Sequence, residues 1–239
     1  MRKGMGKTLH RKMAEKNIAP GHVCEVGVFL PEMSNIIDFI VTDHVKTTLV
    51  EPDPRSIAAI REYFRDYENV TLLPYAVYDH DGELELVQRN ASTFVAELPY
   101  SPALVNDNYV IRKEDTFSVS CKRFDRIDDG SIDLLSVDTE GSEWYVIKYL
   151  KSRPAVISVE THGKSYLNPF LKEITEWMTD NGYARWYMDG SDTVYYREGA
   201  FRVTPVEKIG LFTKGLRVSF RRARKRAGKI LFGRSKTKG

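Results

Sequence analysis

Three short apolar runs of this 239-residue chain end on or beside an acidic residue. Glu25 lies two residues before Gly27, Glu51 closes the second run, and Asp138 closes the third. A carboxylate at the end of a strand can accept hydrogen bonds from ribose hydroxyl groups, and it can take a proton from a reacting hydroxyl group. These residue types therefore predict a nucleotide-binding site next to a site of acid–base chemistry.

Residues 23–34 (VCEVGVFLPEMS) indicate a buried strand that turns through Gly27 toward a helix. Glycine lets the backbone approach a ligand closely, and the unpaired N–H groups at the start of a helix can bind a carboxylate. The G-x-G-x-x-G fingerprint of dinucleotide-binding proteins is absent from this stretch. Taken alone, it therefore gives only weak support to a nucleotide site.

Glu51 ends the next apolar run, within the sequence LVEPDP of residues 49–54. In doubly wound folds, an acidic residue at this point accepts hydrogen bonds from the ribose of a bound nucleotide. The alternative is that Glu51 and Asp53 simply begin a helix, whose dipole favours negative charge at its N-terminus. Because Gly27 lies upstream, ribose binding is the preferred interpretation.

Two later apolar runs carry polar groups to one expected edge of the sheet. The first ends with Asp138 and Glu140, and the second ends with Glu160 and His162. Ligands of open α/β sheets bind at the carboxyl edge, so Asp138 and His162 are the candidate bases, although single residues of these types are more often structural. No spacing of His, Cys and carboxylate residues requires a metal, although Asp138 and Glu160 could reach one.

Short β-rich runs alternate with helical patterns from about residue 22 to residue 196, which predicts an α/β fold with a doubly wound, mainly parallel, seven-stranded sheet. The expected strands are residues 22–26, 47–51, 71–74, 132–137, 155–160, 184–188 and 193–197. The last two form a C-terminal antiparallel hairpin around the turn DGSD. Helices are expected at residues 54–67, 142–150 and 170–181, whose apolar stripes face the core. Residues 81–120 break the alternation with one expected strand at 83–87 and a polar segment that could cover the site as a lid.

The order of these motifs resembles that of the FkbM family of class I methyltransferases, which have a Rossmann-like fold and depend on S-adenosylmethionine. The resemblance covers about residues 22–163, and its most specific part is LLSVDTEGSE at residues 134–143, which is similar to the family's I-D-x-E-G-x-E signature. The segments EVG, VEPDP and YAV followed by DG are similar to the family's other motifs. Because the family mostly methylates hydroxyl groups of natural products and sugars, the resemblance implies O-methylation of a sugar, glycan or other small natural product.

The resemblance also implies roles for single residues of this chain. Glu25 and Gly27 are expected to line the methionine end of the cofactor, in a loop that runs to Phe29. Glu51 is expected to hold the ribose, Ala76 to lie near the adenine, and Asp138 to border both methyl donor and acceptor.

The first loop departs from the family pattern at Pro31, where the family has its second glycine, and at Val28 and Phe29. Proline has a fixed φ and no N–H group, so it cannot copy a left-handed glycine. It does suit the first turn of a helix, and Ser34 still falls where the family has a serine. We therefore expect this loop to follow a different path.

Charge divides the chain into three parts, which we take as a basic N-terminal arm at residues 1–20, a methyltransferase domain at 21–208 and a basic amphipathic tail at 209–239. Residues 210–239 contain eleven Lys or Arg and no Asp or Glu, whereas the remainder has 25 basic and 33 acidic residues. Two cysteines are too few for a disulfide framework, and the N-terminus lacks an apolar signal segment. The expected location is the cytoplasm, and peripheral association with the membrane is a second expected location.

The tail has apolar residues at spacings of three and four, namely Phe212, Leu216, Phe220, Ala223, Ala227 and Ile230 or Leu231. As a helix this set forms one stripe beside basic residues, a pattern typical of helices that lie on anionic membranes. The alternative is that the stripe docks on the body. A catalytically inactive binding or scaffolding module, held at a membrane or nucleic acid by this tail, is the other function considered. The acidity of the body makes nucleic acid the less favoured partner.

Overall fold

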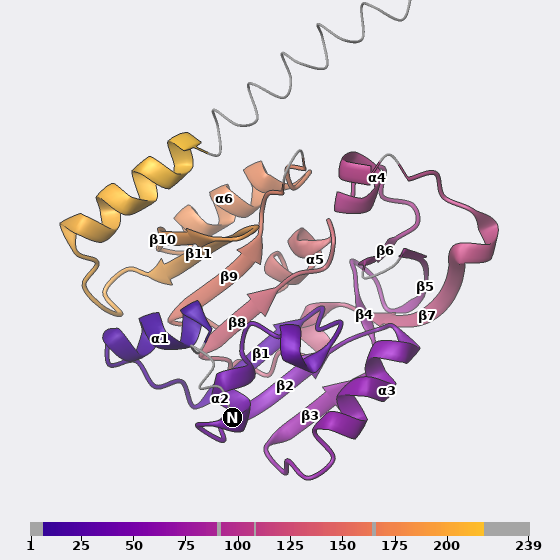
Figure 1. Ribbon diagram of the computed structural model, residues 1–239, viewed down its shortest axis with the longest axis horizontal. Coiled ribbons are helices and arrows are strands. Elements are labelled where there is room, and N and C mark those ends of the chain that lie inside the picture. The colour runs from indigo at the N-terminus through magenta and orange to yellow at the C-terminus, as the bar shows by residue number, and fades with distance from the viewer. Residues whose placement is uncertain (1–6, 90–91, 108, 164–165, 218–239) are drawn as a thin grey trace, which may run out of the picture.

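Two β-sheets of unequal size organise the chain in the computed structural model, which describes residues 7–89, 92–107, 109–163 and 166–217 (Figure 1). The larger sheet has seven strands in the order β10-β11-β9-β8-β1-β2-β3. Every neighbouring pair is parallel except β9 with β11 and β11 with β10. Its strands are β1 (His22–Val26), β2 (Lys46–Val50), β3 (Val70–Leu73), β8 (Leu134–Val137), β9 (Val156–Glu160), β10 (Tyr183–Asp189) and β11 (Asp192–Arg197). The predicted doubly wound, seven-stranded sheet and its C-terminal hairpin are confirmed.

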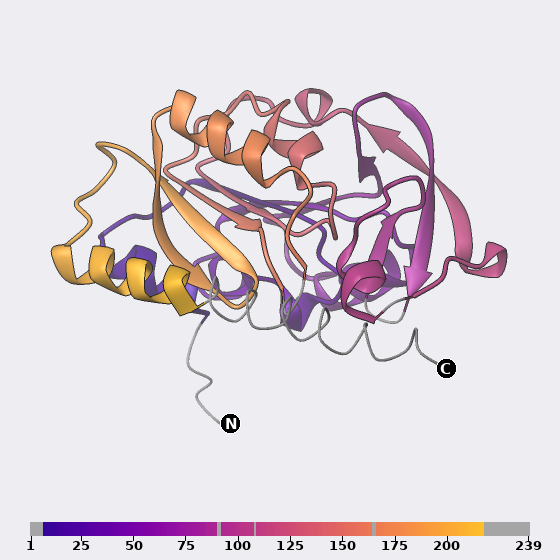
Figure 2. The same cartoon turned by 90° about the horizontal axis from the view of Figure 1, so that it is seen from above.

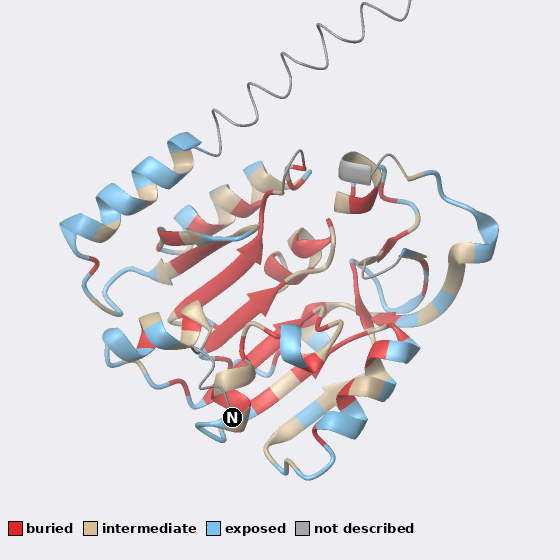
Figure 3. Ribbon diagram, viewed as in Figure 1, coloured by how far each residue is buried: buried red, intermediate tan, exposed pale blue. Residues whose placement is uncertain are grey.

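Helices cover both faces of the large sheet, as the view from above shows (Figure 2). The side chains of β1 alternate between the faces: Cys24 and Val26 belong to one core and Val23 to the other. The first core is closed by α5 (Glu143–Ile147) and α6 (Leu171–Asp180), and the second by α1 (Thr8–Glu15), α2 (Ile37–Val41) and α3 (Pro54–Tyr63). Because the strands are apolar on both sides, they are buried throughout the centre of the molecule (Figure 3).

Helix α3 begins where the sequence predicts and ends four residues earlier than expected. Pro54 occupies its first position, and the side chain of Asp53 caps it by accepting a hydrogen bond of 2.9 Å from the backbone N–H of Arg55. After Tyr63 the chain turns, with the N–H of Tyr67 bonded to the carbonyl of Phe64. This turn directs the chain into β3.

A second sheet occupies the stretch in which only one strand was predicted, so that expectation was incomplete. Its strands β4 (Ala76–Val77), β5 (Gly82–Arg89), β6 (Ser92–Val95) and β7 (Thr116–Lys122) lie in the order β4-β7-β5-β6, beside the large sheet (Figure 1). Short α4 (Pro102–Asp107) lies between β6 and β7. The sequence TFSVSCK of β7 alternates polar and apolar residues, a period of two that would have identified this strand.

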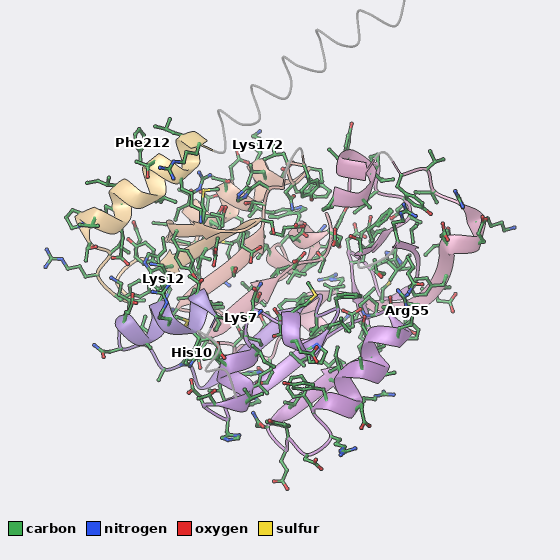
Figure 4. All side chains as sticks on the ribbon, in the orientation of Figure 1. Lys7, His10, Lys12, Arg55, Lys172 and Phe212 are labelled. Atoms are coloured by element: carbon green, nitrogen blue, oxygen red, sulfur yellow. The ribbon has the colours of Figure 1, made fainter. Side chains whose placement is uncertain are left out.

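The N-terminal arm packs against the body through α1, whose Leu9 and Met13 are buried in the second core. Residues 205–217 are helical and stand at the edge of the molecule, where Figure 4 labels Phe212. Glu207 joins this helix to the body, because it accepts hydrogen bonds from Lys16 at 2.6 Å and from the indole N–H of Trp186 at 2.9 Å. The tail residues beyond 217 lie outside the described residues.

The apolar side chains of this last helix face outward: Val206, Ile209, Phe212 and Leu216 are 54–78% exposed. The described part of the predicted stripe therefore does not dock on the body.

Glu207→Gln is expected to lower the free energy of unfolding by about 1.5–3 kcal/mol at pH 7, since the lost bonds involve charged partners. Although burial raises the pKa of Glu207, its hydrogen bonds with Lys16, Thr204 and Trp186 outweigh that effect and lower the pKa to about 2. A lowered pKa gives stability above the unfolded-state pKa and loses it as pH falls, so the difference between variant and wild type should shrink from about pH 4.5 toward pH 2. Urea unfolding across this range measures it. Glu62→Gln, which removes an exposed acid, is the control, and an equal effect of the two variants would contradict the assignment.

Candidate functional site

A cavity of about 980 Å³ opens at the carboxyl ends of β1, β2 and β8. The residues that the sequence predicted to bind a cofactor all line it: Glu25, Gly27, Phe29, Glu51, Ala76 and Asp138. The second sheet and the β10–β11 turn complete the wall. The structure thus brings motifs from four separate stretches of sequence to one hollow.

Gly27 lies in contact with the backbone at the end of β8. Its φ is +85°, and a Cβ atom built on it would lie 1.8 Å from the carbonyl oxygen of Asp138. The N–H of Asp138 in turn bonds to the carbonyl of Val26 at 3.0 Å. Only glycine fits here, because both the backbone conformation and the available space exclude a side chain.

The carboxylate of Glu51 holds the loop after β1 in place through hydrogen bonds. One of its oxygens accepts the N–H groups of Val28 at 2.8 Å and Phe29 at 3.2 Å, and the other accepts the N–H of Asp53 at 2.8 Å. Burial raises the pKa of Glu51, and the three donors act in the opposite direction. Phe29 has a left-handed φ of +45°, which the bond to Glu51 helps to hold. Contact between Glu51 and a ribose stays a prediction.

Glu25 holds the far end of the same loop. Its carboxylate accepts the hydroxyl of Ser34, the N–H of Asn35 at 2.9 Å and the hydroxyl of Ser136 at 3.3 Å. Burial raises the pKa of Glu25 to about 7, although these donors lower it. Pro31 is the first residue of a short 3-10 helix (Pro31–Met33), so the expected use of proline in a first helical turn is confirmed.

The loop after β8 is folded around Glu143, which is fully buried. Its carboxylate accepts the N–H groups of Thr139 at 2.9 Å and Gly141 at 3.0 Å, and the amide of Asn168 at 2.5 Å. Glu140 and Gly141 have φ of +55° and +116°, so the loop reverses tightly. Glu143 therefore holds Asp138 at the cavity, a role that the sequence did not reveal.

Asp138 is the candidate base that lines the cavity. Burial, followed by the charges of Asp192 and Glu140, raises its pKa well above the usual range. One carboxylate oxygen each from Asp138, Glu143 and Glu160 lie within 4.8 Å of one another. Burial and these neighbouring carboxylates also raise the pKa of Glu160.

His162 is buried, and its Nδ1 lies 3.0 Å from the hydroxyl oxygen of Thr161. It is not among the residues that line the cavity. The structure therefore brings Asp138 but not His162 to the cavity wall, and a part of His162 in the transfer step stays a prediction.

Sequence reasoning missed two walls of the cavity. Apolar side chains of the second sheet, Leu86, Phe94 and Val95, line one of them. The second sheet contacts the segment that follows β2, because Gln88 and Thr93 donate hydrogen bonds to Asp53 at 2.7 and 3.0 Å. Leu86 and Val95 are paired across β5 and β6 and share one face, whereas Phe94 lies on the other face with Val87.

The other missed wall is formed by α1 and the β10–β11 turn, through Lys7, Arg11, Tyr187 and residues 189–192. Asp192 accepts hydrogen bonds from Asn35 at 3.1 Å and Ser158 at 3.2 Å, and burial raises its pKa to about 6. The sequence predicted only the turn at residues 189–192, and it predicted it from the residues that tight turns prefer, not from features of a binding site.

Comparison with known proteins gives one extended match, a family model described as Methyltransferase FkbM domain, over residues 25–184. No curated protein sequence matches the chain.

Solved structures resemble it more distantly. Precorrin-6y C5,15-methyltransferase from Geobacter metallireducens GS-15 is 14% identical with a TM-score of 0.39, over 83% of this chain and 92% of that chain. A SAM dependent methyltransferase from Aquifex aeolicus is 13% identical with a TM-score of 0.44, over 80% and 89%. Fibrillarin from Aeropyrum pernix, solved with bound S-adenosyl-L-methionine, is 10% identical with a TM-score of 0.44, over 79% and 73%. Likenesses at these scores carry no information about substrate.

Gly27→Ala is expected to cost at least about 2 kcal/mol of unfolding free energy, because the new methyl group would overlap the backbone of Asp138. Gly130→Ala is the matched control: Gly130 has a similar φ of +90°, but a Cβ there would meet nothing within 4 Å. The control therefore measures only the cost of placing alanine at a positive φ, about 1–2 kcal/mol, without any overlap with neighbouring atoms. Thermal and urea unfolding of both variants measure the difference, and equal losses would show that the close contact is unimportant.

Proposed function

The chain belongs to the FkbM methyltransferase family, and we propose that it transfers the methyl group of S-adenosylmethionine to a hydroxyl oxygen of a sugar, glycan or other small natural product. The observation that supports this most is that five residues of the family's motifs, namely Glu25, Gly27, Glu51, Ala76 and Asp138, line one cavity. Its volume of about 980 Å³ lies at the upper end of the range of about 300–1,000 Å³ for ligand sites. It therefore has room for the cofactor and an acceptor together.

The residues present suit this cofactor. The loop of Glu25, Gly27 and Phe29 would hold its methionine end, where Gly27 allows a close approach of the backbone. The Oε1 atom of Glu51 accepts a single N–H group and can accept one more hydrogen bond, so Glu51 would receive a ribose hydroxyl. The apolar wall near Ala76 suits an adenine ring.

When bound, S-adenosylmethionine supplies an electrophilic methyl group on its sulfonium. The cavity walls hold the acceptor oxygen in line with that group, and orientation of this kind is worth roughly 7–11 kcal/mol of the barrier. The hydroxyl proton of the acceptor passes to a carboxylate oxygen of Asp138, whose raised pKa makes it a stronger base than an exposed aspartate. Asp138 rather than His162 takes this proton, because Asp138 lines the cavity and His162 does not.

Asp138→Asn is expected to lower turnover by about 10²–10⁴-fold, since the amide cannot accept the proton. The measurement is transfer of label from the cofactor into fractions of a cell extract, followed by rate measurements on the acceptor found. Calorimetry with S-adenosylmethionine is the control, because the variant keeps the shape of Asp138 and should still bind the cofactor. Wild-type turnover in the variant would remove Asp138 as the base. A wild-type protein that binds no cofactor would instead favour the inactive binding module.

We also propose that the last helix brings the enzyme to an anionic membrane. Its exposed apolar residues Val206, Ile209, Phe212 and Leu216 recur at spacings of three and four, so they share one face. Residues 210–239 add eleven basic and no acidic residues, and each basic residue near an anionic surface contributes about 1 kcal/mol. Within the described part of the chain, no helix is long and apolar enough to cross a bilayer. Binding would therefore be peripheral.

Vesicle co-sedimentation tests the tail. At low salt, the full chain should pellet with vesicles that contain phosphatidylserine, and a chain ending at Lys208, which keeps the contacts of Glu207, should not. A full-length Phe212→Ser and Leu216→Ser double variant separates the apolar face from the basic charge, and we expect it to bind more weakly than wild type. Equal sedimentation of the full and shortened chains would rule out the tail as a membrane anchor.

A further inference from the structure

Three carboxylates meet at the carboxyl edge of the large sheet. Asp138 follows β8, Glu143 begins α5, and Glu160 ends β9. One oxygen from each lies within 4.8 Å of the other two. Oxygen ligands lie about 2.3–2.6 Å from Ca²⁺ and about 2.0–2.1 Å from Mg²⁺, so two ligands of one ion are at most about 5 Å apart for Ca²⁺ and about 4.2 Å apart for Mg²⁺. The spacing therefore fits the first coordination sphere of one ion.

Glu160 is the member of this cluster that is buried without a compensating partner among the described residues. Its side chain is only 7% exposed, and its Oε2 atom is buried without a hydrogen-bond partner. Among the described residues, none of the twelve ion pairs involves Asp138, Glu143 or Glu160. A buried carboxylate oxygen that receives no donor is unfavourable, and additional negative charges nearby make it more so.

The other two carboxylates have properties of metal ligands. Glu143 is oriented by Thr139, Gly141 and Asn168, and such hydrogen bonds hold a ligand in place. Asp138 lines the cavity, whereas Glu160 does not. An ion at the cluster would thus have protein ligands behind it and an open side toward the cavity.

We propose that Asp138, Glu143 and Glu160 bind one divalent cation of the oxygen-preferring group that includes Ca²⁺, Mn²⁺ and Mg²⁺, with its remaining coordination positions facing the cavity. Carboxylate oxygens are the ligands that Mg²⁺ and Mn²⁺ prefer, and Mg²⁺ usually keeps several water molecules. The ion would replace the repulsion among the three acids by attraction.

The part that this ion plays rests on the proposed function. A cation at the open side can bind the acceptor oxygen and lower the pKa of its hydroxyl group. Asp138 can serve in both ways, because a carboxylate has two oxygens: one holds the ion and the other accepts the proton. The substrate class this favours is an acceptor with oxygen atoms on adjacent carbons, such as a sugar diol, which can chelate the ion.

Mn²⁺ is the probe for the binding test, because its electron paramagnetic resonance signal distinguishes free from bound ions. The full-length protein, without cofactor or acceptor, should bind one Mn²⁺ that Mg²⁺ displaces. Glu160→Gln and Asp138→Asn should each weaken binding by about tenfold or more. Asp189→Asn is the matched control, since Asp189 lines the same cavity but lies outside the cluster, and it should retain the wild-type affinity within about twofold.

A wild-type protein that binds no Mn²⁺, or a Glu160→Gln variant that binds it as tightly as wild type, would overturn the proposal and show that the cluster binds protons instead. Circular dichroism verifies that each variant is folded. If Glu160→Gln does not fold, Glu160→Asp and Asp138→Asn decide. Methyl transfer is assayed separately with and without EDTA. Failure of ion binding therefore leaves the proposed methyl transfer standing, and failure of methyl transfer leaves the ion site standing.

Discussion

The contact between Gly27 and the carbonyl of Asp138 is the constraint on which the site depends. It holds the loop after β1 against the end of β8, so the residues proposed to face the cofactor and the residue proposed as the base meet at one backbone junction. Glu51 and Glu25 then secure the loop from its two sides through N–H and hydroxyl donors. Because these carboxylates hold the loop, it accommodates Pro31 at the position where the family has its second, more flexible glycine.

Buried acids divide into two groups by what surrounds them. Glu25, Glu51 and Glu143 each accept three hydrogen bonds, which hold the loops beside them in place. Asp138 and Glu160 stand at neighbouring strand ends, and the Oε2 atom of Glu160 has no hydrogen-bond partner among the described residues. Buried acidic residues thus hold loops where hydrogen-bond donors surround them. Where such donors are few, they can take part in the proposed reaction.

The sequence predicted the large sheet well because its strands are short apolar runs between glycine and helix signals; β1 matches the expected residues at both ends. It also led to residues that line one cavity, since motif order determines which strand ends are adjacent, and their contact with a cofactor stays a prediction. It did not predict the second sheet, whose strands are half polar, or the role of Glu143, which depends on a three-dimensional turn. The position of His162 behind the wall also depends on packing that linear spacing does not encode.

Residues 76–122 leave the large sheet after β3 and return before β8, and they form a sheet with a core of its own. This small sheet contributes one wall of the cavity but none of the strands that carry Glu25, Glu51 or Asp138. Substitutions at Leu86, Phe94 and Val95 of β5 and β6 can therefore reshape what the cavity admits without changing Glu25, Glu51 or Asp138. Within a lineage of such proteins, acceptor preference can diversify by changes in this one insert, at little risk to the rest of the fold.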